Sequence, residues 1–114
     1  MFRGDVWIVD FAEPVGRRPA VIISSNALNP RLSSVTVVEI TGTPGPPETH
    51  IEVDSDDGLT GRPRSFVNAT GIHTVRKPLL LQQRGRLTRG TMAQIEEALC
   101  TILDIDLNLT SDWP

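Results

Sequence analysis

Polar and apolar residues alternate near the start of the chain, at the spacing of a strand with one buried face. Residues 5–11 follow this pattern. Residues 19–24, PAVIIS, instead form an almost continuous apolar run rich in β-branched side chains. Such a run predicts a strand buried on both faces. Pro19 fits this strand only at its first residue or at an edge, because proline lacks a backbone donor.

Further strands follow at short intervals. Residues 34–41, SVTVVEIT, carry the strongest signal because β-branched residues dominate them. Alternation also predicts strands at 49–54, 65–75 and 79–87. A bend is expected at Gly71. Turn residues mark the segments between these strands as loops, at 25–33, 42–48 and 55–64.

The period changes near the end of the chain. From Thr88 onward, apolar residues recur every three or four positions, as on one face of a helix: Met92, Ile95, Leu99 and Ile102. Thr88 is placed to cap this helix through a backbone N–H near Thr91. Short strands followed by one helix predict a mainly β (α+β) fold, a small twisted barrel closed by a C-terminal helix. We expect residues 1–114 to form one domain.

Composition narrows the class of protein. The chain has 114 residues and no apolar run long enough to cross a bilayer. Its N-terminus lacks the pattern of a secretion signal, so a cytoplasmic protein is expected. The single cysteine, Cys100, is interpreted as a packing residue. No cluster of Cys and His has metal-binding spacing, and no metal or cofactor is predicted.

Charge is unevenly distributed although the net charge is only −3. Residues 48–57 carry five acids, and residues 96–114 carry five acids and no base. Residues 58–95 carry seven bases and no acid: Arg62, Arg64, Arg76, Lys77, Arg84, Arg86 and Arg89. A local basic field can attract an anion such as RNA. The alternative is that these arginines pair with the acidic segments.

Two positions at strand ends are candidates for phosphate chemistry. Arg17 and Arg18 stand just before the buried run, and Pro19 biases Arg18 toward an extended backbone. A guanidinium there offers planar donors that match phosphate oxygens, or it pairs with a surface carboxylate. Thr41 ends the strand 34–41, where its hydroxyl either meets a phosphate or forms a turn. Only one pairing of the two strands brings Arg18 and Thr41 to the same rim.

The segments RGDVWIVDF, GRRPAVIIS and VTVVEITGT, followed by a basic strand and a helix, resemble the MazF/PemK family of toxin endoribonucleases. The resemblance runs over about residues 3–105. It implies an SH3-like β-barrel of the CcdB/PemK type that forms a homodimer. It also implies sequence-specific, metal-independent cleavage of single-stranded RNA (mRNA, tRNA or rRNA), which blocks translation and growth. The implied partner is a cognate MazE-like antitoxin with a disordered inhibitory tail. The resemblance implies that the toxin contacts DNA only indirectly, through this antitoxin.

The family's catalytic arginine and threonine fall on Arg18 and Thr41. The loop from Ala12 to Arg17 is shorter than in many members. A glutamine and an arginine common in the family fall by position on Gly71 and His73. Predicted RNA contacts are Arg17, Glu39, Thr43, Arg64, Ser65 and His73.

The implied reaction is attack of the RNA 2′-hydroxyl on the adjacent phosphorus, giving a 2′,3′-cyclic phosphate and a 5′-hydroxyl. Arg18 would stabilise the charge of the transition state but is a poor base. Glu39, which shares a strand face with Thr41, and His73 are alternative proton acceptors. A pair of histidines, His50 and His73, is a weaker alternative design.

Two other functions remain open from the sequence. Toxins of the same fold poison DNA gyrase through a hydrophobic C-terminal tail, which residues 106–114 resemble only loosely. A barrel that binds RNA or protein without cutting is the other alternative. Cleavage of RNA in EDTA separates both from a nuclease.

Overall fold

The computed structural model describes residues 1–53 and 64–106. Its elements, in chain order, are β1 (Asp5–Asp10), β2 (Arg17–Ile22), β3 (Ser34–Thr41), β4 (His50–Val53), β5 (Ser65–Arg76), the 3-10 turn η2 (Lys77–Leu79), β6 (Leu80–Arg86) and α1 (Arg89–Ile102). The predicted strands and C-terminal helix are confirmed, with the ends of β3 as expected from the sequence.

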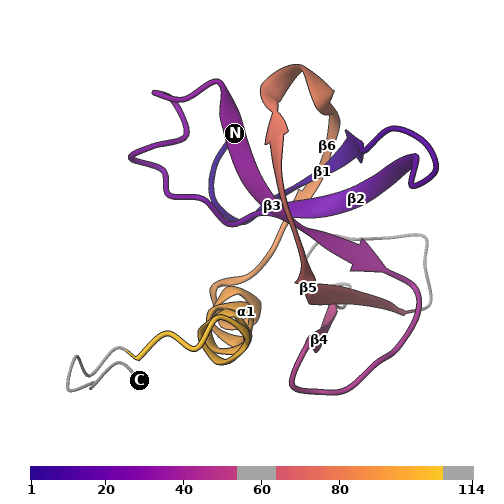
Figure 1. Ribbon diagram of the computed structural model, residues 1–114, viewed down its shortest axis with the longest axis vertical. Helices are drawn as coiled ribbons and strands as arrows, with labels where there is room; N and C mark the ends of the chain where they lie inside the picture. Colours follow the sequence, from indigo (N-terminus) through magenta and orange to yellow (C-terminus); the bar gives the residue numbers. More distant parts are fainter. Residues whose placement is uncertain (54–63, 107–114) are drawn as a thin grey trace.

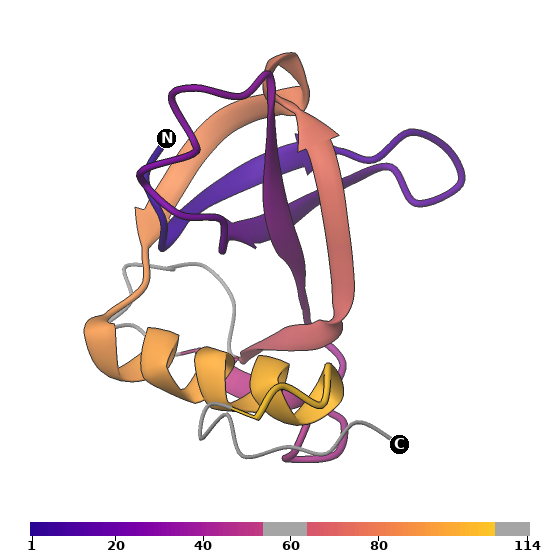
Figure 2. The ribbon, with the colours of Figure 1, turned by 60° about the vertical axis from the view of Figure 1, so that its left-hand side comes forward.

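The strands form one antiparallel sheet in the order β4-β5-β3-β2-β1-β6. The sheet coils strongly, and α1 lies across one end of it (Figures 1 and 2). No ladder joins β4 to β6 within the described ranges, so the sheet curls like a barrel without closing. The mainly β fold with one helix is as predicted.

Two apolar clusters lie on the two faces of the sheet. One contains Val21, Val38 and the α1 residues Met92 and Ile95 among its members. The other contains Ala20, Ile22, Val35 and Val37. Successive residues of β2 and β3 therefore enter different clusters, which explains why these strands are apolar at almost every position.

β2 begins two residues earlier than the apolar run predicts, because β1 continues the ladder through Val9↔Arg18 and Asp10↔Arg17. Pro19 is thus the third residue of the strand. The ladder to β3 starts only at Ala20. At Pro19 the strand has β1 as its one neighbour, so the proline occupies a local edge, as the sequence requires.

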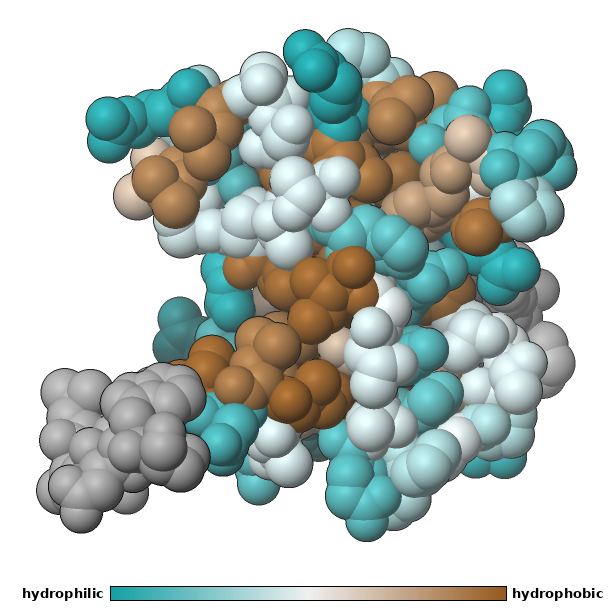
Figure 3. Space-filling model, viewed as in Figure 1, coloured by the Kyte–Doolittle hydropathy of each residue, from teal (hydrophilic) through white to brown (hydrophobic). Residues whose placement is uncertain are grey.

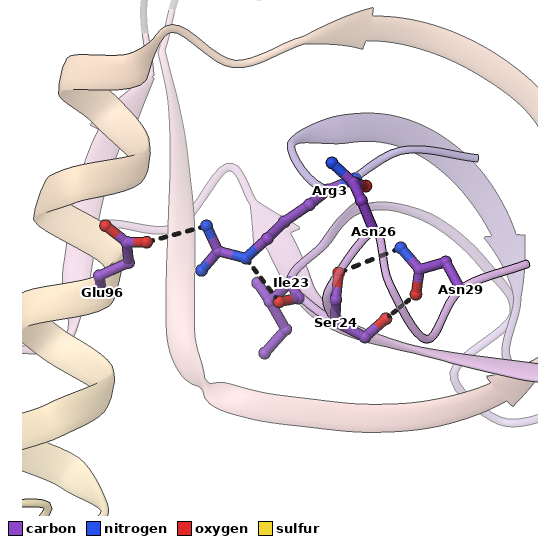
Figure 4. Close-up of polar contacts among 6 residues, drawn as sticks. All are labelled: Arg3, Ile23, Ser24, Asn26, Asn29 and Glu96. Atoms are coloured by element: carbon purple, nitrogen blue, oxygen red, sulfur yellow. Dashed lines mark hydrogen bonds and ion pairs between the residues drawn. The ribbon is translucent and has the colours of Figure 1, made fainter.

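The helix is fixed to the sheet by polar contacts as well as by its apolar stripe. Thr88 caps α1 by accepting from the backbone N–H of Thr91. The Arg3 guanidinium donates to Glu96 on α1 at 2.8 Å and to the carbonyl of Ile23 at 2.8 Å (Figure 4).

Apolar surface remains where the helix meets the sheet (Figure 3). Four partly buried residues pack against the cluster that contains Met92 and Ile95: Ile23 just after β2, Ile72 of β5, and Leu99 and Ile102 of α1. Cys100, also on α1, is partly buried. No helix in the described part of the chain is long and apolar enough to span a membrane.

Candidate active site

The register of β2 against β3 places the two predicted catalytic residues at the same end of one sheet face. Ala20 pairs with Glu39 in an antiparallel ladder. Two residues further toward the same end of the sheet lie Arg18 on β2 and Thr41 on β3. Because side chains alternate along a strand, both share the face of Ala20 and Glu39. The pairing that the sequence left open is the one that brings these positions to one rim.

Arg18 is the second residue of β2 and is exposed. The hairpin loop that joins β1 to β2 projects from the sheet (Figure 2). Its Nε donates one long bond, 3.4 Å, to the carbonyl of Val15. Among the described residues no carboxylate forms an ion pair with Arg18. Its guanidinium therefore keeps donors available for an anion.

Thr41 is the last residue of β3 and is partly buried. Its Oγ1 accepts from the backbone N–H of Thr43 at 3.1 Å. This contact uses a lone pair of the oxygen and leaves the hydroxyl proton free to be donated. The turn interpretation and the phosphate interpretation of Thr41 are thus compatible. Thr43 is exposed just beyond the strand.

Glu39 and His73 are brought together by an irregularity in β5. Val38 pairs with Ile72, but the next residue of β3, Glu39, pairs with Asn68. Residues 69–71 of β5 therefore have no partner in the ladder with β3. This is the bend that the sequence predicts near Gly71. Nε2 of His73 lies 3.0 Å from Oε2 of Glu39. Both candidate proton acceptors therefore belong to one contact pair.

Gly71 makes room for this pair. A Cβ at position 71 would lie 2.7 Å from Oε2 of Glu39, closer than a methyl group and an oxygen can approach. The His73 ring also packs against Phe11, with 4.7 Å between ring centroids. The sequence analysis did not assign Phe11 to the site, although alternation from Val9, the partner of Arg18, puts Phe11 on the same face.

A cavity of about 610 Å³ adjoins the pair. It runs between the start of the β1–β2 hairpin and the second half of β5. Its lining is Asp10, Phe11, Ala12, Ile72, His73, Thr74, Val75, Arg76 and Leu79. Besides His73, the lining therefore holds the aromatic ring of Phe11, the carboxyl group of Asp10 and the guanidinium of Arg76. The described residues contain no group of His, Cys, Asp and Glu placed to hold a metal ion.

The other predicted RNA contacts are more scattered. Arg17 pairs with Asp10 in the ladder, one position before Arg18, so the two arginines point to opposite faces. Ser65 is buried, 6% exposed, at the start of β5. Arg64 is exposed, pairs with Glu52 at 3.0 Å and stacks over Phe66 at 5.2 Å. Phe66 is the ladder partner of Thr41, which places Arg64 near the same rim.

Within the described part of the basic segment 58–95, some arginines form ion pairs and others do not. Arg64 and Arg86 form ion pairs, the latter with the buried Asp5 at 2.8 Å. Arg76 is exposed and lines the cavity. Arg62 and the tail residues 107–114 lie outside the described residues. Pairing with acidic segments therefore accounts for part of the predicted basic field and leaves Arg76 available.

Comparison with known proteins places the chain in a family. Residues 2–103 match the model of the family described as PemK-like, MazF-like toxin of type II toxin–antitoxin systems. Endoribonuclease MazF1 of Mycobacterium bovis and endoribonuclease MazF4 of Mycobacterium tuberculosis are each 35% identical over 98% of this chain and 95% of their own length. A solved mycobacterial endoribonuclease in complex with its cognate antitoxin superposes with a TM-score of 0.82 at 33% identity, covering 100% of this chain and 99% of that one. The chain belongs to the PemK-like, MazF-like toxin family of type II toxin–antitoxin systems.

Proposed function

We propose that this protein is a toxin that cleaves single-stranded RNA at the rim formed by Arg18 and Thr41. Its endoribonuclease activity follows from curated relatives of that name that match nearly the whole chain. The observation that carries the site assignment is the β2–β3 register, which puts an arginine without a carboxylate partner and a threonine hydroxyl at one end of one face. Cleavage is sequence-specific and needs no metal or cofactor.

The residue types fit one reaction. The RNA 2′-oxygen attacks the adjacent phosphorus while the 5′-oxygen leaves, giving a 2′,3′-cyclic phosphate and a 5′-hydroxyl. Negative charge gathers on the phosphoryl oxygens in the transition state. Fixed donors aimed at those oxygens contribute most, about 3–4 kcal/mol for one donor. Arg18 supplies such donors and a proton for the leaving oxygen, and the Thr41 hydroxyl supplies a further donor.

Single-stranded RNA fits this site better than a duplex. In-line attack requires the sugar and phosphate to swing out of helical geometry, which an unpaired strand allows. Arg17, Thr43, Arg64 and Ser65 are proposed to contact the strand beyond the scissile phosphate. In the cell, cleavage of mRNA, tRNA or rRNA would block translation and growth.

The functional unit is proposed to be a cytoplasmic homodimer restrained by a cognate antitoxin. The similar mycobacterial endoribonuclease was solved with its antitoxin, and this chain shares its fold over the full length. A MazE-like antitoxin would lay a disordered tail across the RNA site. Contact with DNA would then occur only through the antitoxin.

The test is digestion of a long RNA and of a short fluorescent oligonucleotide in EDTA, with the new 5′-ends mapped. Arg18→Ala should fold normally and lose about 100-fold or more in rate, and Thr41→Ala should lose less. Arg17→Ala, its neighbour on the opposite face, should weaken RNA binding with a smaller effect on rate. Parental cleavage by Arg18→Ala would overturn the site assignment. Intact RNA with blocked DNA supercoiling would favour a gyrase poison, and binding without fragments would favour a silent barrel.

A further inference from the structure

We propose that His73 accepts the proton of the attacking 2′-hydroxyl and that Glu39 is its positioning residue. This inference rests on the proposed function and goes further, because it assigns the proton acceptor of the reaction. Arg18 and Thr41 can stabilise charge on the phosphate, but neither is a base near neutral pH. The reaction therefore needs a third group on the same face.

The contact between the two side chains fixes which nitrogen of His73 is available. An ionised carboxylate only accepts hydrogen bonds, so Nε2 of His73 must carry the proton in its 3.0 Å contact with Oε2 of Glu39. In the neutral ring Nδ1 then holds a lone pair. Among the described residues no hydrogen bond is formed at Nδ1 of His73. The free nitrogen is thus the one suited to take a proton from a ligand.

His73, rather than Glu39, faces the space where a ligand fits. Its side chain is 37% exposed and lines the 610 Å³ cavity, whereas Glu39 is 22% exposed and is not part of the lining. Cavities of about 300–1,000 Å³ are the usual size for a small-molecule ligand. Phe11 packs against the ring, and Glu39 holds its Nε2 edge. These two contacts set the orientation of Nδ1.

The pair lies on the same face as the phosphate-binding residues. Glu39 is two residues before Thr41 on β3, with Ala20 as its partner on β2, two residues after Arg18. From the other side, Phe11 lies two residues after Val9, the ladder partner of Arg18, and it reaches His73 across the coiled sheet. Both routes place the imidazole on the sheet face that carries Arg18, although the cavity lining itself includes neither Arg18 nor Thr41.

A purely structural role explains the pair less well. Eight residue pairs already join β3 to β5, so the strands need no side-chain clamp. A partly exposed contact of this kind contributes about 1 kcal/mol or less. Yet Glu39 is a charged residue on a face where Val35 and Val37 are fully buried, and Gly71 leaves space for its carboxylate. A histidine oriented by a carboxylate is the arrangement that activates a hydroxyl nucleophile in many enzymes.

The step balances in protons and bonds. Nδ1 of His73 takes the 2′-hydroxyl proton as the bond from the 2′-oxygen to phosphorus forms. The bond from phosphorus to the 5′-oxygen breaks, and the 5′-oxygen takes a proton from the Arg18 guanidinium. The imidazolium, stabilised by the Glu39 carboxylate, returns its proton through solvent to Arg18.

The other charged groups that border the cavity with His73 are Asp10 of β1 and Arg76 of β5.

The experiment measures single-turnover cleavage of an RNA oligonucleotide in EDTA and, separately, binding of its uncleavable 2′-deoxy analogue by fluorescence anisotropy. His73→Gln should cut at least about 100-fold more slowly and still bind the analogue, because general-base catalysis contributes about 10²–10⁴-fold. His50→Gln is the matched control. His50 lies on β4, outside the cavity lining, with Nδ1 bonded to Thr49 Oγ1 at 2.8 Å. Its rate should stay within about threefold of the parent.

Two further variants separate catalysis from folding. Glu39→Gln keeps the shape and should cut about tenfold more slowly with unchanged analogue binding, as expected when the ring loses its orienting charge. His73→Ala should regain cleavage when free imidazole is added. Melting curves check that each variant folds. If His73→Gln does not fold, Glu39→Gln and the imidazole rescue decide the question.

The outcomes distinguish this inference from the function on which it rests. If the parent cleaves, Arg18→Ala does not, and His73→Gln cleaves within about threefold of the parent, His73 is not the acceptor. A loss that appears only in binding of the analogue overturns it as well. If the parent itself leaves RNA intact in EDTA, the proposed function fails.

Discussion

Replacing Gly71 by alanine tests the geometry of the Glu39–His73 pair without altering either member. The added Cβ would lie 2.7 Å from Oε2 of Glu39 and 3.3 Å from its Cβ. The far end of the glutamate is the part that can move. Its carboxylate must therefore rotate away, and the 3.0 Å contact with His73 is lost.

The expected effect on stability is small because two terms of opposite sign nearly cancel. Gly71 does not need a positive φ, so alanine fits the backbone and reduces the freedom of the unfolded chain, which stabilises by about 0.4–1 kcal/mol. Loss of the partly exposed contact between the imidazole and the carboxylate costs up to about 1 kcal/mol. The sum lies near zero, and a change of about 1 kcal/mol would move the melting temperature by only about 4–8 °C.

The expected effect on activity is much larger. Gly71→Ala should cut RNA about tenfold more slowly, like Glu39→Gln, with unchanged binding of the 2′-deoxy analogue. Because both changes weaken the same interaction between position 39 and His73, the double variant should be no slower than the slower single one.

Single-turnover kinetics in EDTA, a melting curve and this double-mutant cycle form the assay. Gly71→Ala that cuts at the parental rate would refute the reasoning, since the pair would then be dispensable. Additive losses in the cycle would show that alanine acts through β5 rather than through Glu39.

Two further predictions concern stability. Asp5→Asn should lower the free energy of unfolding, measured in urea, by about 1–3 kcal/mol, because the buried carboxylate accepts from the Phe2 backbone N–H and from Arg86, both at 2.8 Å. The exposed control Glu52→Gln should change the free energy of unfolding by less than about 1 kcal/mol, and equal effects of the two variants would contradict the role of burial. Thr88→Ala removes the N-cap of α1 and should cost about 1 kcal/mol in the same assay, whereas an unchanged midpoint would mean that packing alone fixes the start of the helix.

The strands and the helix could be predicted because their patterns are local. The apolar positions of β3 alternate between two clusters, and the α1 stripe buries Met92 and Ile95 against one of them. The start of β2 was misjudged because Arg17 and Arg18 are polar and carry no strand signal. They are extended only because β1 offers Val9 and Asp10 as ladder partners.

The site was only partly readable from the sequence because it depends on long-range register. Arg18 and Thr41 were located by residue type and family resemblance, but their position at one end of the same face follows from the pairing of Ala20 with Glu39. The contact between Glu39 and His73 could not be predicted at all, since it depends on how many residues of β5 are unpaired beside Val38. Phe11 could have been assigned to the site from the sequence, because simple alternation along the strand places it on the face of Arg18.

The position of Glu39 is the strongest sign that this face was shaped by something other than stability. On β3 the same face carries Val35 and Val37, both buried, and Ala20 beside Glu39 on β2 is completely buried. An apolar residue at position 39 would continue that pattern and bury further apolar surface at about 25 cal/mol per Å². Instead the chain has a carboxylate, a histidine to meet it and a glycine that leaves space for it. Departures from local pattern concentrate at functional sites. Here three of them, on two strands, meet at His73, which lines a cavity and lies on the sheet face that also carries Arg18, an arginine without a carboxylate partner among the described residues.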